Sequence, residues 1–403
     1  MEIEFLDAAD YSARARLDEV TDEDRAEIDR AAGLFRALGL LAGEVDLVDA
    51  LSDLSDLSDS GTLAFYDPEQ ERITVRGQEL TPAVRGTLVH ELTHALQDQH
   101  FDLGALLEEA GEAGMSFVAD AVIEGDAMRI EHGYVESLGA EDAAAYEAAQ
   151  VTSAADVAGL EAVPDALVSL FGAPYAFGDL FVQVVTGESG PDVVDELFRD
   201  LPASEQQVFD PVAWFEGRPP VDVAVPDVGD AEVDWEGPFG VPTLYLVLAT
   251  RIGPKEALAA ADAWAGDASV TFRRDERSCV AISFATAPGE ADLLTGALES
   301  WRATLPAGTA VVGRAGDLVE LESCDPGTQG ELARGDQDPF VLPVVRTTLL
   351  QQWLAEGAEM TAAACFAGRV VDELPLELLT AASLTDEELA QVSETANAVA
   401  LRC

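Results

Sequence analysis

The chain has 403 residues and a formal net charge of −55, because 77 aspartates and glutamates outnumber 22 lysines and arginines. A surface this acidic repels nucleic acid and anionic membranes, so both are excluded as partners. Apolar residues make up 48% of the chain, which is typical of a globular protein and excludes intrinsic disorder.

The acidity itself has several explanations. A salt-rich habitat, calcium bound by surface carboxylates, and a compositional habit of the genome all fit it. The sequence has no run of about eighteen apolar residues, so no membrane span is expected. The start, MEIEFLDAADY, lacks the basic flank and the apolar run of a signal peptide, which indicates either a cytosolic protein or a mature, trimmed form.

The first part of the chain is expected to contain little chemistry. Residues 3–6 are typical of a short strand, and residues 21–39 and 44–57 are typical of helices. Residues 61–76 predict a β-hairpin whose turn contains Pro68. A free strand edge of this hairpin would suit an extended peptide, and the alternative is that the hairpin only covers the helix that follows.

The stretch TPAVRGTLVHELTHALQDQHF, which begins at Thr81, holds three of the four histidines of the chain. Thr81 suits a helix N-cap and Pro82 the first helical position, so the stretch is predicted to be a helix. Residues four apart lie on one helix face, so His90 and His94 of the HExxH motif can bind one zinc ion. Glu91 lies about 100° around the helix, where a general base belongs. An amphipathic helix with two polar-face histidines is the alternative.

Zinc needs a third protein ligand, and the next predicted helix, residues 114–136, supplies candidates. Glu124 interrupts an apolar run there, which is costly unless its carboxylate is paired or bound to a metal. His132 and Asp120 are the alternative third ligands. Gly125 follows Glu124 directly and predicts the close approach of another backbone.

Two aspartates of this second helix, Asp120 and Asp126, are candidates to bond the outer nitrogen of a ligand histidine and fix its tautomer. His100, near the end of the HExxH helix, is expected to be structural. The motif also contains the ExxH of di-iron helical proteins, which need a second ExxH on a partner helix. The residue three before His132 is Arg129, so the sequence excludes that site.

The string HELTHALQDQHF, followed about thirty residues later by VIEGDA, resembles the glutamate-liganded HExxH zinc peptidases, or gluzincins. More closely, the chain resembles a poorly characterised family of prokaryotic envelope or surface proteins that carry HELTHALQDQHFDL and EGDA. The likeness covers residues 61–301 and includes PYAFGDLFV, ASEQQVFDP and WAGDASVTF. It implies a zincin-like core with three zinc ligands and a catalytic base: His90, His94, Glu124 and Glu91. Asp210 departs from the family pattern, since histidine is expected there, and its role stays open.

Residues 139–151 and 153–170 are expected to be helical, and a further helix is expected to follow the PYAFG segment and end near residue 185. Tyr175, within that segment, is a candidate to donate a hydrogen bond to the oxyanion of a tetrahedral intermediate. A tyrosine in the hydrophobic core is the alternative.

Two segments are typical of linkers: the proline- and acid-rich residues 218–234 and residues 327–338. Strand and helix patterns between them predict a small α+β unit, and three or four short helices are expected afterwards. The predicted fold class is therefore α+β and mainly helical. It comprises a zincin-like metallopeptidase domain in residues 1–225, an α+β accessory module in 226–330 and a helical domain in 338–403.

The four cysteines lie in the last third of the chain without the CxxC spacing of a zinc ribbon. Their even number predicts two disulfides, most simply Cys279–Cys324 and Cys365–Cys403, and hence an oxidising compartment. Four reduced, buried thiols are the alternative. An extracellular or cell-envelope location is expected, with the cytoplasm as the alternative.

Together these patterns predict a metallohydrolase with one catalytic zinc ion, and among such enzymes a peptidase that acts on a peptide or protein substrate. A zinc-stabilised surface or binding protein without turnover is the alternative. The sequence carries no signal for cleavage preference or oligomeric state.

Overall fold

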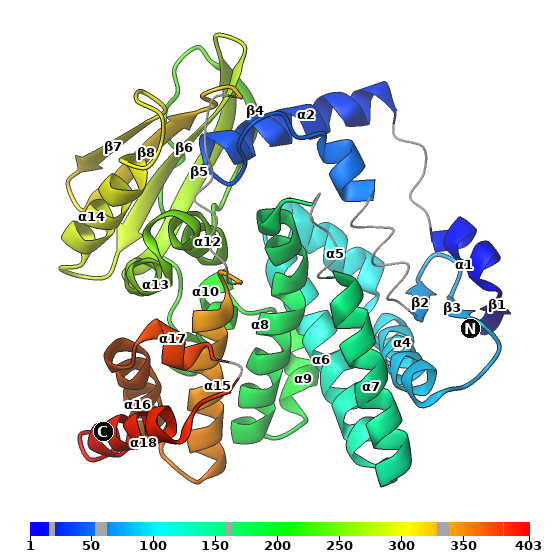
Figure 1. Cartoon of the computed structure of the whole chain (residues 1–403). Helices are drawn as coiled ribbons and strands as arrows, with labels where there is room; N and C mark the ends of the chain where they lie inside the picture. Colours follow the sequence, from blue (N-terminus) through cyan, green and yellow to red (C-terminus); the bar gives the residue numbers. More distant parts are fainter. Residues whose placement is uncertain (16–20, 53–62, 158–162, 329–337, 382) are drawn as a thin grey trace. The chain divides into compact units, whose positions relative to one another are not determined.

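The computed structural model describes residues 1–15, 21–52, 63–157, 163–328, 338–381 and 383–403 (Figure 1). Helices account for 58% and strands for 15%, which confirms the predicted mainly helical α+β class. The chain divides into two compact units. Unit 1 consists of Met1–Asp29, Val45–Val182 and Val194–Leu201, and unit 2 of Arg30–Glu44, Gln183–Val193 and Pro202–Cys403. The three-domain division expected from the sequence stays a prediction.

A three-stranded sheet lies near the N-terminus in unit 1. β1 (Glu2–Leu6), which leads into α1 (Ala8–Ala15), pairs in parallel with β3 (Arg72–Arg76). β3 also pairs antiparallel with β2 (Ala64–Asp67), so the predicted hairpin forms and β2 is an edge strand. The sheet packs on the next helix through a small apolar core: Ala64, Ile73, Val75, Val84 and Ala95.

The HExxH helix, α4 (Pro82–Phe101), begins as the sequence predicts. The Thr81 hydroxyl accepts a hydrogen bond from the Val84 amide at 3.3 Å and so caps the helix. α4 ends at Asp102, whose φ of 53° is left-handed. The Asp102 side chain then caps the following helix, α5 (Leu103–Glu112).

Two helices of unit 1 touch through their backbones. A Cβ atom built on Gly125 of α6 (Ser116–Glu136) would lie 2.3 Å from the carbonyl oxygen of Gly178 in α8 (Asp165–Ser189). A Cβ atom built on Gly178 would lie 2.1 Å from the carbonyl oxygen of Ala121. A larger residue at either glycine would push the helices apart. The close backbone approach predicted at Gly125 is therefore confirmed.

The helices that follow α6 differ from the prediction. α7 (Ala140–Val157) is one helix where a break near residue 152 was expected, and the next helix, α8, begins only at Asp165. Pro174 lies inside α8, although the sequence predicted that a new helix would start after the PYAFG segment. An internal proline removes one backbone hydrogen bond. We attribute the continuity of α8 to the burial of its apolar residues, including Phe177 and Phe181.

α8 is also the one described helix that is long and apolar enough to cross a membrane, by length and composition only. Core helices of soluble proteins meet the same criterion, so no membrane assignment follows. The absence of a membrane span stays a prediction. Three short helices come next: α9 (Val193–Arg199), α10 (Glu205–Phe209) and α11 (Pro211–Phe215).

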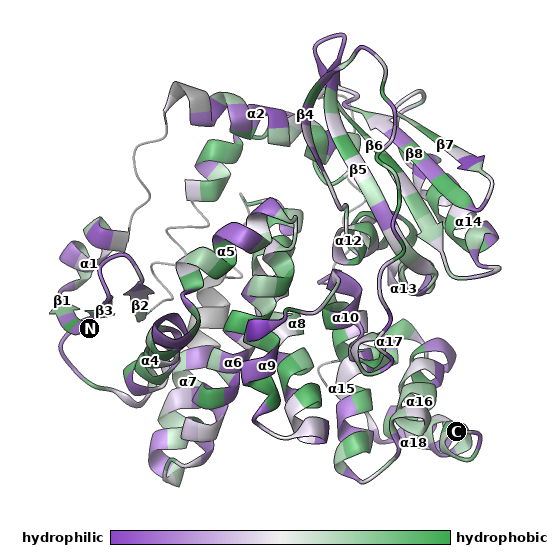
Figure 2. Ribbon diagram, turned by 180° about the vertical axis from the view of Figure 1, so that it is seen from behind, coloured by the Kyte–Doolittle hydropathy of each residue, from purple (hydrophilic) through white to green (hydrophobic). Residues whose placement is uncertain are grey.

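Unit 2 contains a five-stranded antiparallel sheet in the order β4-β5-β6-β8-β7. Its strands are β4 (Glu232–Gly237), β5 (Trp264–Arg274), β6 (Arg277–Thr286), β7 (Ala310–Ala315) and β8 (Leu318–Cys324). Unit 2 also contains α12 (Val241–Ile252), α13 (Pro254–Asp262) and α14 (Ala291–Arg302). Along β8 hydrophilic and hydrophobic residues alternate, and Val319 and Leu321 are buried (Figure 2). The strands and the helix predicted in this region are present, and β4 is an additional strand that starts at the end of the segment predicted to be a linker and runs past it.

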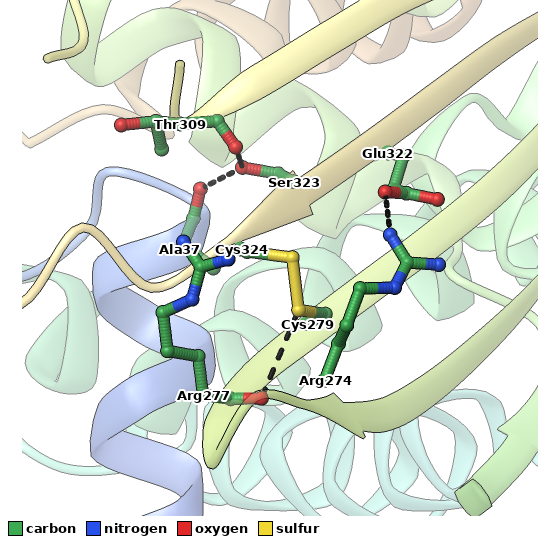
Figure 3. The surroundings of a disulfide bond; sticks show 8 residues. All are labelled: Ala37, Arg274, Arg277, Cys279, Thr309, Glu322, Ser323 and Cys324. Atoms are coloured by element: carbon green, nitrogen blue, oxygen red, sulfur yellow. Dashed lines mark hydrogen bonds and ion pairs between the residues drawn. A yellow bond between two sulfur atoms is a disulfide. The ribbon is translucent and has the colours of Figure 1, made fainter. Parts of the chain in front are cut away.

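Both predicted disulfides are present, Cys279–Cys324 and Cys365–Cys403. The first joins residues directly opposite each other on β6 and β8. Next to it, the Ser323 hydroxyl donates a hydrogen bond of 2.6 Å to the carbonyl of Ala37, the last residue of α2 (Asp22–Ala37) (Figure 3). Disulfides are compatible with an extracellular protein.

The C-terminal part of unit 2 is helical, as predicted. It contains α15 (Val341–Ala355), α16 (Met360–Glu373), α17 (Leu376–Leu379) and α18 (Asp386–Ala400), the last with the predicted capping box at Thr385. Lys255, the only lysine of the chain, donates from Nζ to the carbonyls of Asp372 and Leu374, which satisfies the C-terminal end of α16.

The Cys365–Cys403 bridge ties the last residue of the chain to α16 across 38 residues. Replacing both cysteines with serine is expected to lower the free energy of unfolding by about 2–4 kcal/mol, because the unfolded chain then gains loop entropy. Denaturant unfolding of the double variant measures the change. Unchanged stability would mean that the apolar contacts of α18 hold the C-terminus without the bridge.

Candidate metal centre

Three side chains of unit 1 converge as a metal site would require. His90 and His94 lie on α4 and Glu124 on α6, and one potential ligand atom from each lies within 4.8 Å of the others. His90 Nε2 is 3.2 Å and His94 Nε2 is 3.5 Å from Glu124 Oε2. All three side chains are largely buried, with 12–19% of their surface exposed. The structure thus brings together the three predicted ligands.

The outer nitrogen of each histidine has a partner of its own. His90 Nδ1 lies 3.3 Å from Glu131 Oε2, an ion-pair contact without the alignment of a hydrogen bond, and His94 Nδ1 is hydrogen-bonded to Gln97 Oε1 at 2.9 Å. Because both partners are acceptors, each Nδ1 carries a proton when the imidazole is neutral, and each Nε2 is left with a lone pair. Two imidazole nitrogens and one carboxylate that face one another are the donor set of a catalytic zinc site with a position left for water. The residues therefore fit zinc.

These partners are held in turn by neighbouring helices. Glu131 accepts a hydrogen bond of 2.8 Å from the Tyr146 hydroxyl of α7. The Gln97 amide nitrogen donates to Asp126 Oδ2 at 3.0 Å and also to a backbone carbonyl of α6. Such outer contacts fix the orientation of the imidazole rings.

The two aspartates predicted to contact the ligand histidines do not contact them directly. Asp126 reaches His94 only through Gln97, and Asp120 forms no hydrogen bond or ion pair with either histidine in the described part of the chain. Glu131 and Gln97 do make these contacts. Both have a periodic signal in the sequence, since Glu131 follows Glu124 by two helical turns and Gln97 follows His94 by one.

The remaining histidines lie outside this cluster. His132, an alternative third ligand, is 46% exposed and its Nδ1 lies 3.5 Å from Asp179 Oδ1. His100 lies near the C-terminus of α4, exposed, with Nδ1 2.8 Å from the Leu96 carbonyl oxygen, which fits the structural role predicted for it.

Glu91 occupies a buried position between α4 and the edge strand. Its side chain accepts a hydrogen bond of 2.8 Å from the backbone amide of Tyr66 on β2, and only 8% of the residue is exposed. Burial raises the pKa of Glu91 to about 7, although the nearby His94 and His90 act in the opposite direction. A carboxylate with a pKa near neutrality is suited to take and return a proton.

Tyr175 of α8 lies beside the same group of carboxylates. Burial of its hydroxyl raises the pKa of Tyr175, and the nearby carboxylates of Glu124 and Glu91 raise it further. The residue as a whole is 37% exposed, and its ring lies 6.3 Å from that of Phe171. The Tyr175 phenol is therefore protonated and lies close to Glu124, the predicted zinc ligand. A hydrogen-bond donor at this site needs both properties.

Zinc uptake is expected to release protons. Burial lowers the pKa of His90, but the carboxylates of Glu124 and Glu131 raise it more, to about 10. Burial raises the pKa of Glu124, but the contacts with both histidines lower it more, to about 2. The metal-free site therefore holds a proton on imidazole that a zinc ion must displace. We expect the apparent zinc affinity to rise about tenfold per pH unit between about pH 6 and 8. Titration calorimetry in buffers of different ionisation enthalpy counts the protons, and pH-independent affinity would contradict the expectation.

Glu131→Gln is expected to weaken zinc binding by about 10–100-fold, because the amide no longer stabilises the His90 ring as a carboxylate does. Competition with a chelating dye measures the affinity. Glu136→Gln, at the C-terminal end of the same helix, is the control and should bind zinc as the unaltered chain does. Equal affinities for both variants would remove Glu131 from the site.

Asp210, whose role the resemblance leaves open, belongs to unit 2 and not to the unit that holds the cluster. No family model, curated protein or solved structure matches the chain, so the resemblance to gluzincins and to envelope proteins stays a prediction.

Proposed function

We propose that the chain is a zinc-dependent peptidase. The observation that carries the proposal is the orientation of two histidines: Glu131 and Gln97 engage their outer nitrogens, and both Nε2 atoms face Glu124. If the two histidines lay on the polar face of the helix only by chance, there would be no reason for an acceptor beside each Nδ1 atom. His90, His94 and Glu124 would hold the ion.

When bound, zinc supplies Lewis acidity, which polarises a carbonyl and makes water more acidic. Glu91 would take the proton of the attacking water and then deliver it to the leaving amine. The pKa of Glu91, about 7, supports both the uptake and the return of a proton near neutral pH. The Tyr66 amide holds the carboxylate in place during the transfer.

Two further groups support peptide hydrolysis in particular. Tyr175 would donate a hydrogen bond to the oxyanion that forms on the scissile carbonyl. β2 is an edge strand, and its amide at Tyr66 contacts Glu91, so an extended peptide paired with β2 would pass close to the base. Backbone pairing of this kind recognises peptides through groups that every peptide has.

We also propose an extracellular or cell-envelope location, supported by the two disulfides. In such a compartment the acidic surface would meet calcium at concentrations that weak carboxylate sites can bind.

The proposal is tested by the zinc content of the purified chain and by cleavage of casein with and without a chelator. About one zinc per chain and cleavage that stops with the chelator and returns with zinc would support a peptidase. Zinc without cleavage of casein or of a peptide library would favour a zinc-stabilised binding protein. A chain that binds no zinc would contradict the metal centre itself.

A further inference from the structure

Unit 2 contains a cavity of about 310 Å³ that has no residue in common with the metal centre. We call it the Arg346 pocket. Its wall combines four charged side chains and the polar Gln206 and Thr347 with small or aliphatic residues. The residues that carry the argument are Asp210, Arg218, Asp262, Arg346, Leu350 and Gly368. A volume at the lower end of the range for ligand sites suits a small molecule.

The charged part of the wall presents both signs. Arg346 on α15 pairs with Asp262 at 2.6 Å, while Arg218 lies 3.8 Å from Asp210. Arg346 Nη2 is buried and has no hydrogen-bond partner among the described residues. A buried guanidinium donor without an acceptor is costly. The Arg346 side chain is 12% exposed, so a small turn of the guanidinium would bring Nη2 to a ligand carboxylate in the pocket.

Asp210 favours the opposite charge in a ligand. One carboxylate oxygen caps α11 through the Val212 amide at 3.2 Å, and the other lies 3.8 Å from Arg218 Nη2. Burial raises the pKa of Asp210 more than Arg346 and Arg218 lower it, so the carboxylate gains from a further cation. Asp210 and Asp262 in the pocket, together with the net charge of −55, would repel a ligand that carried only a negative charge.

Apart from Gln206 and Thr347, which are polar, the uncharged residues of the wall come mainly from α16. Ala364, Ala367 and Gly368 of this helix line the pocket together with Val212 and Leu350. A Cβ atom built on Gly368 would have no neighbour within 4 Å, so open space lies above that turn of the helix. Such a surface contacts an aliphatic group and offers no hydrogen bond to a polar one.

We propose that the Arg346 pocket binds a free aliphatic α-amino acid. The carboxylate would pair with Arg346, the ammonium with Asp210, and the side chain would lie along Ala364 and Gly368. An α-amino acid carries both charges on one carbon next to an apolar group, which is the combination that the wall presents. The proposal does not depend on the metal centre, because none of its residues belongs to that site.

Titration calorimetry of the full chain with L-leucine tests the proposal. Two analogues separate the charges: 4-methylpentanoate lacks the ammonium, and isopentylamine lacks the carboxylate. Leucine is expected to bind at least about tenfold more tightly than either, because each analogue leaves one charged side chain without its partner. No heat with leucine, or equal affinity for leucine and either analogue, would overturn the proposal.

A matched pair of substitutions locates the site. Gly368→Leu fills the open space with an aliphatic side chain and is expected to weaken leucine binding by at least about tenfold, while Gly368→Ala adds one methyl group and should retain most of it. Both replace a helical glycine with a better helix former, and thermal melts would verify that both variants fold. Unchanged binding by a folded Gly368→Leu variant would overturn the location.

Arg346→Lys tests the charged contact. Lysine keeps the positive charge beside Asp262 but lacks the planar fork that offers two donors. Leucine affinity is expected to fall about tenfold, whereas zinc content should stay the same. Leucine binding that is equal in the variant and in the unaltered chain would exclude Arg346 as the carboxylate contact.

Discussion

Glu91→Gln is expected to leave zinc in place and to lower the rate of peptide hydrolysis by about 10²–10⁴-fold. Glutamine has the shape of glutamate and its amide oxygen can still accept the hydrogen bond from the Tyr66 amide, so the local structure should persist. It cannot take a proton from water at neutral pH. The loss should therefore lie in kcat, with zinc content unchanged.

Metal analysis and cleavage of an internally quenched peptide, compared side by side, measure both quantities. Glu112→Gln, on the exposed surface of α5, is a suitable control, since it removes one negative charge from unit 1 without touching the cluster. Full activity in Glu91→Gln would remove Glu91 from the mechanism. Loss of zinc in the same variant would show that its role is to support the ligands.

Glu124→Ala is expected to weaken zinc binding by at least about 100-fold, more than the loss of an outer partner such as Glu131. The substitution removes one of three ligands and leaves two neutral imidazoles, which bind the dication more weakly than a site with a carboxylate does. Chelator competition followed by metal analysis of the purified variant gives the change.

Asp120→Ala is the matched control, because Asp120 lies one turn earlier on the same helix and has a carboxylate of its own. Burial and the charge of Glu124 raise the pKa of Asp120 to about 6. If Asp120→Ala lost zinc and Glu124→Ala kept it, the ligand set would have to be rebuilt around Asp120. His132→Ala serves the same purpose for the other alternative ligand.

The parts of the site that depend on one helix were predictable from the sequence. Thr81, Pro82 and the HExxH spacing define where α4 begins and which residues share its face. Glu124 was identified because a carboxylate within an apolar run needs a partner, and Gly125 because a glycine there permits close helix contact. Each of these inferences uses only local periodicity and the cost of burial.

The outer partners were not predicted because they depend on how helices cross. Glu131 contacts His90 only because α6 lies against α4 along two turns, and Tyr146 joins from a third helix. Periodicity indicates that Glu131 and Glu124 share a face, but it does not indicate which carboxylate meets Nδ1. The choice of Asp120 and Asp126 was wrong for this reason.

The errors in secondary structure have a similar origin. β4 is exposed along nearly its whole length, and pairing with β5 makes it a strand although its sequence, EVDWEG, has little apolar pattern. Pro174 would end an isolated helix, but α8 continues because its apolar residues are buried in the core. In both places tertiary contacts override local preference.

Because the chain has a single lysine, chemical modification of that residue can be used to follow the C-terminal end of α16. The chain has two amines, the N-terminus and Lys255, and the Lys255 amine is bonded to the last carbonyls of α16. An amine-reactive ester is therefore expected to modify Lys255 faster when these hydrogen bonds break. The acylation rate at one residue, followed by mass spectrometry of tryptic peptides, reports the local opening of the C-terminal helices without a label, a substitution or a second reactive lysine to correct for.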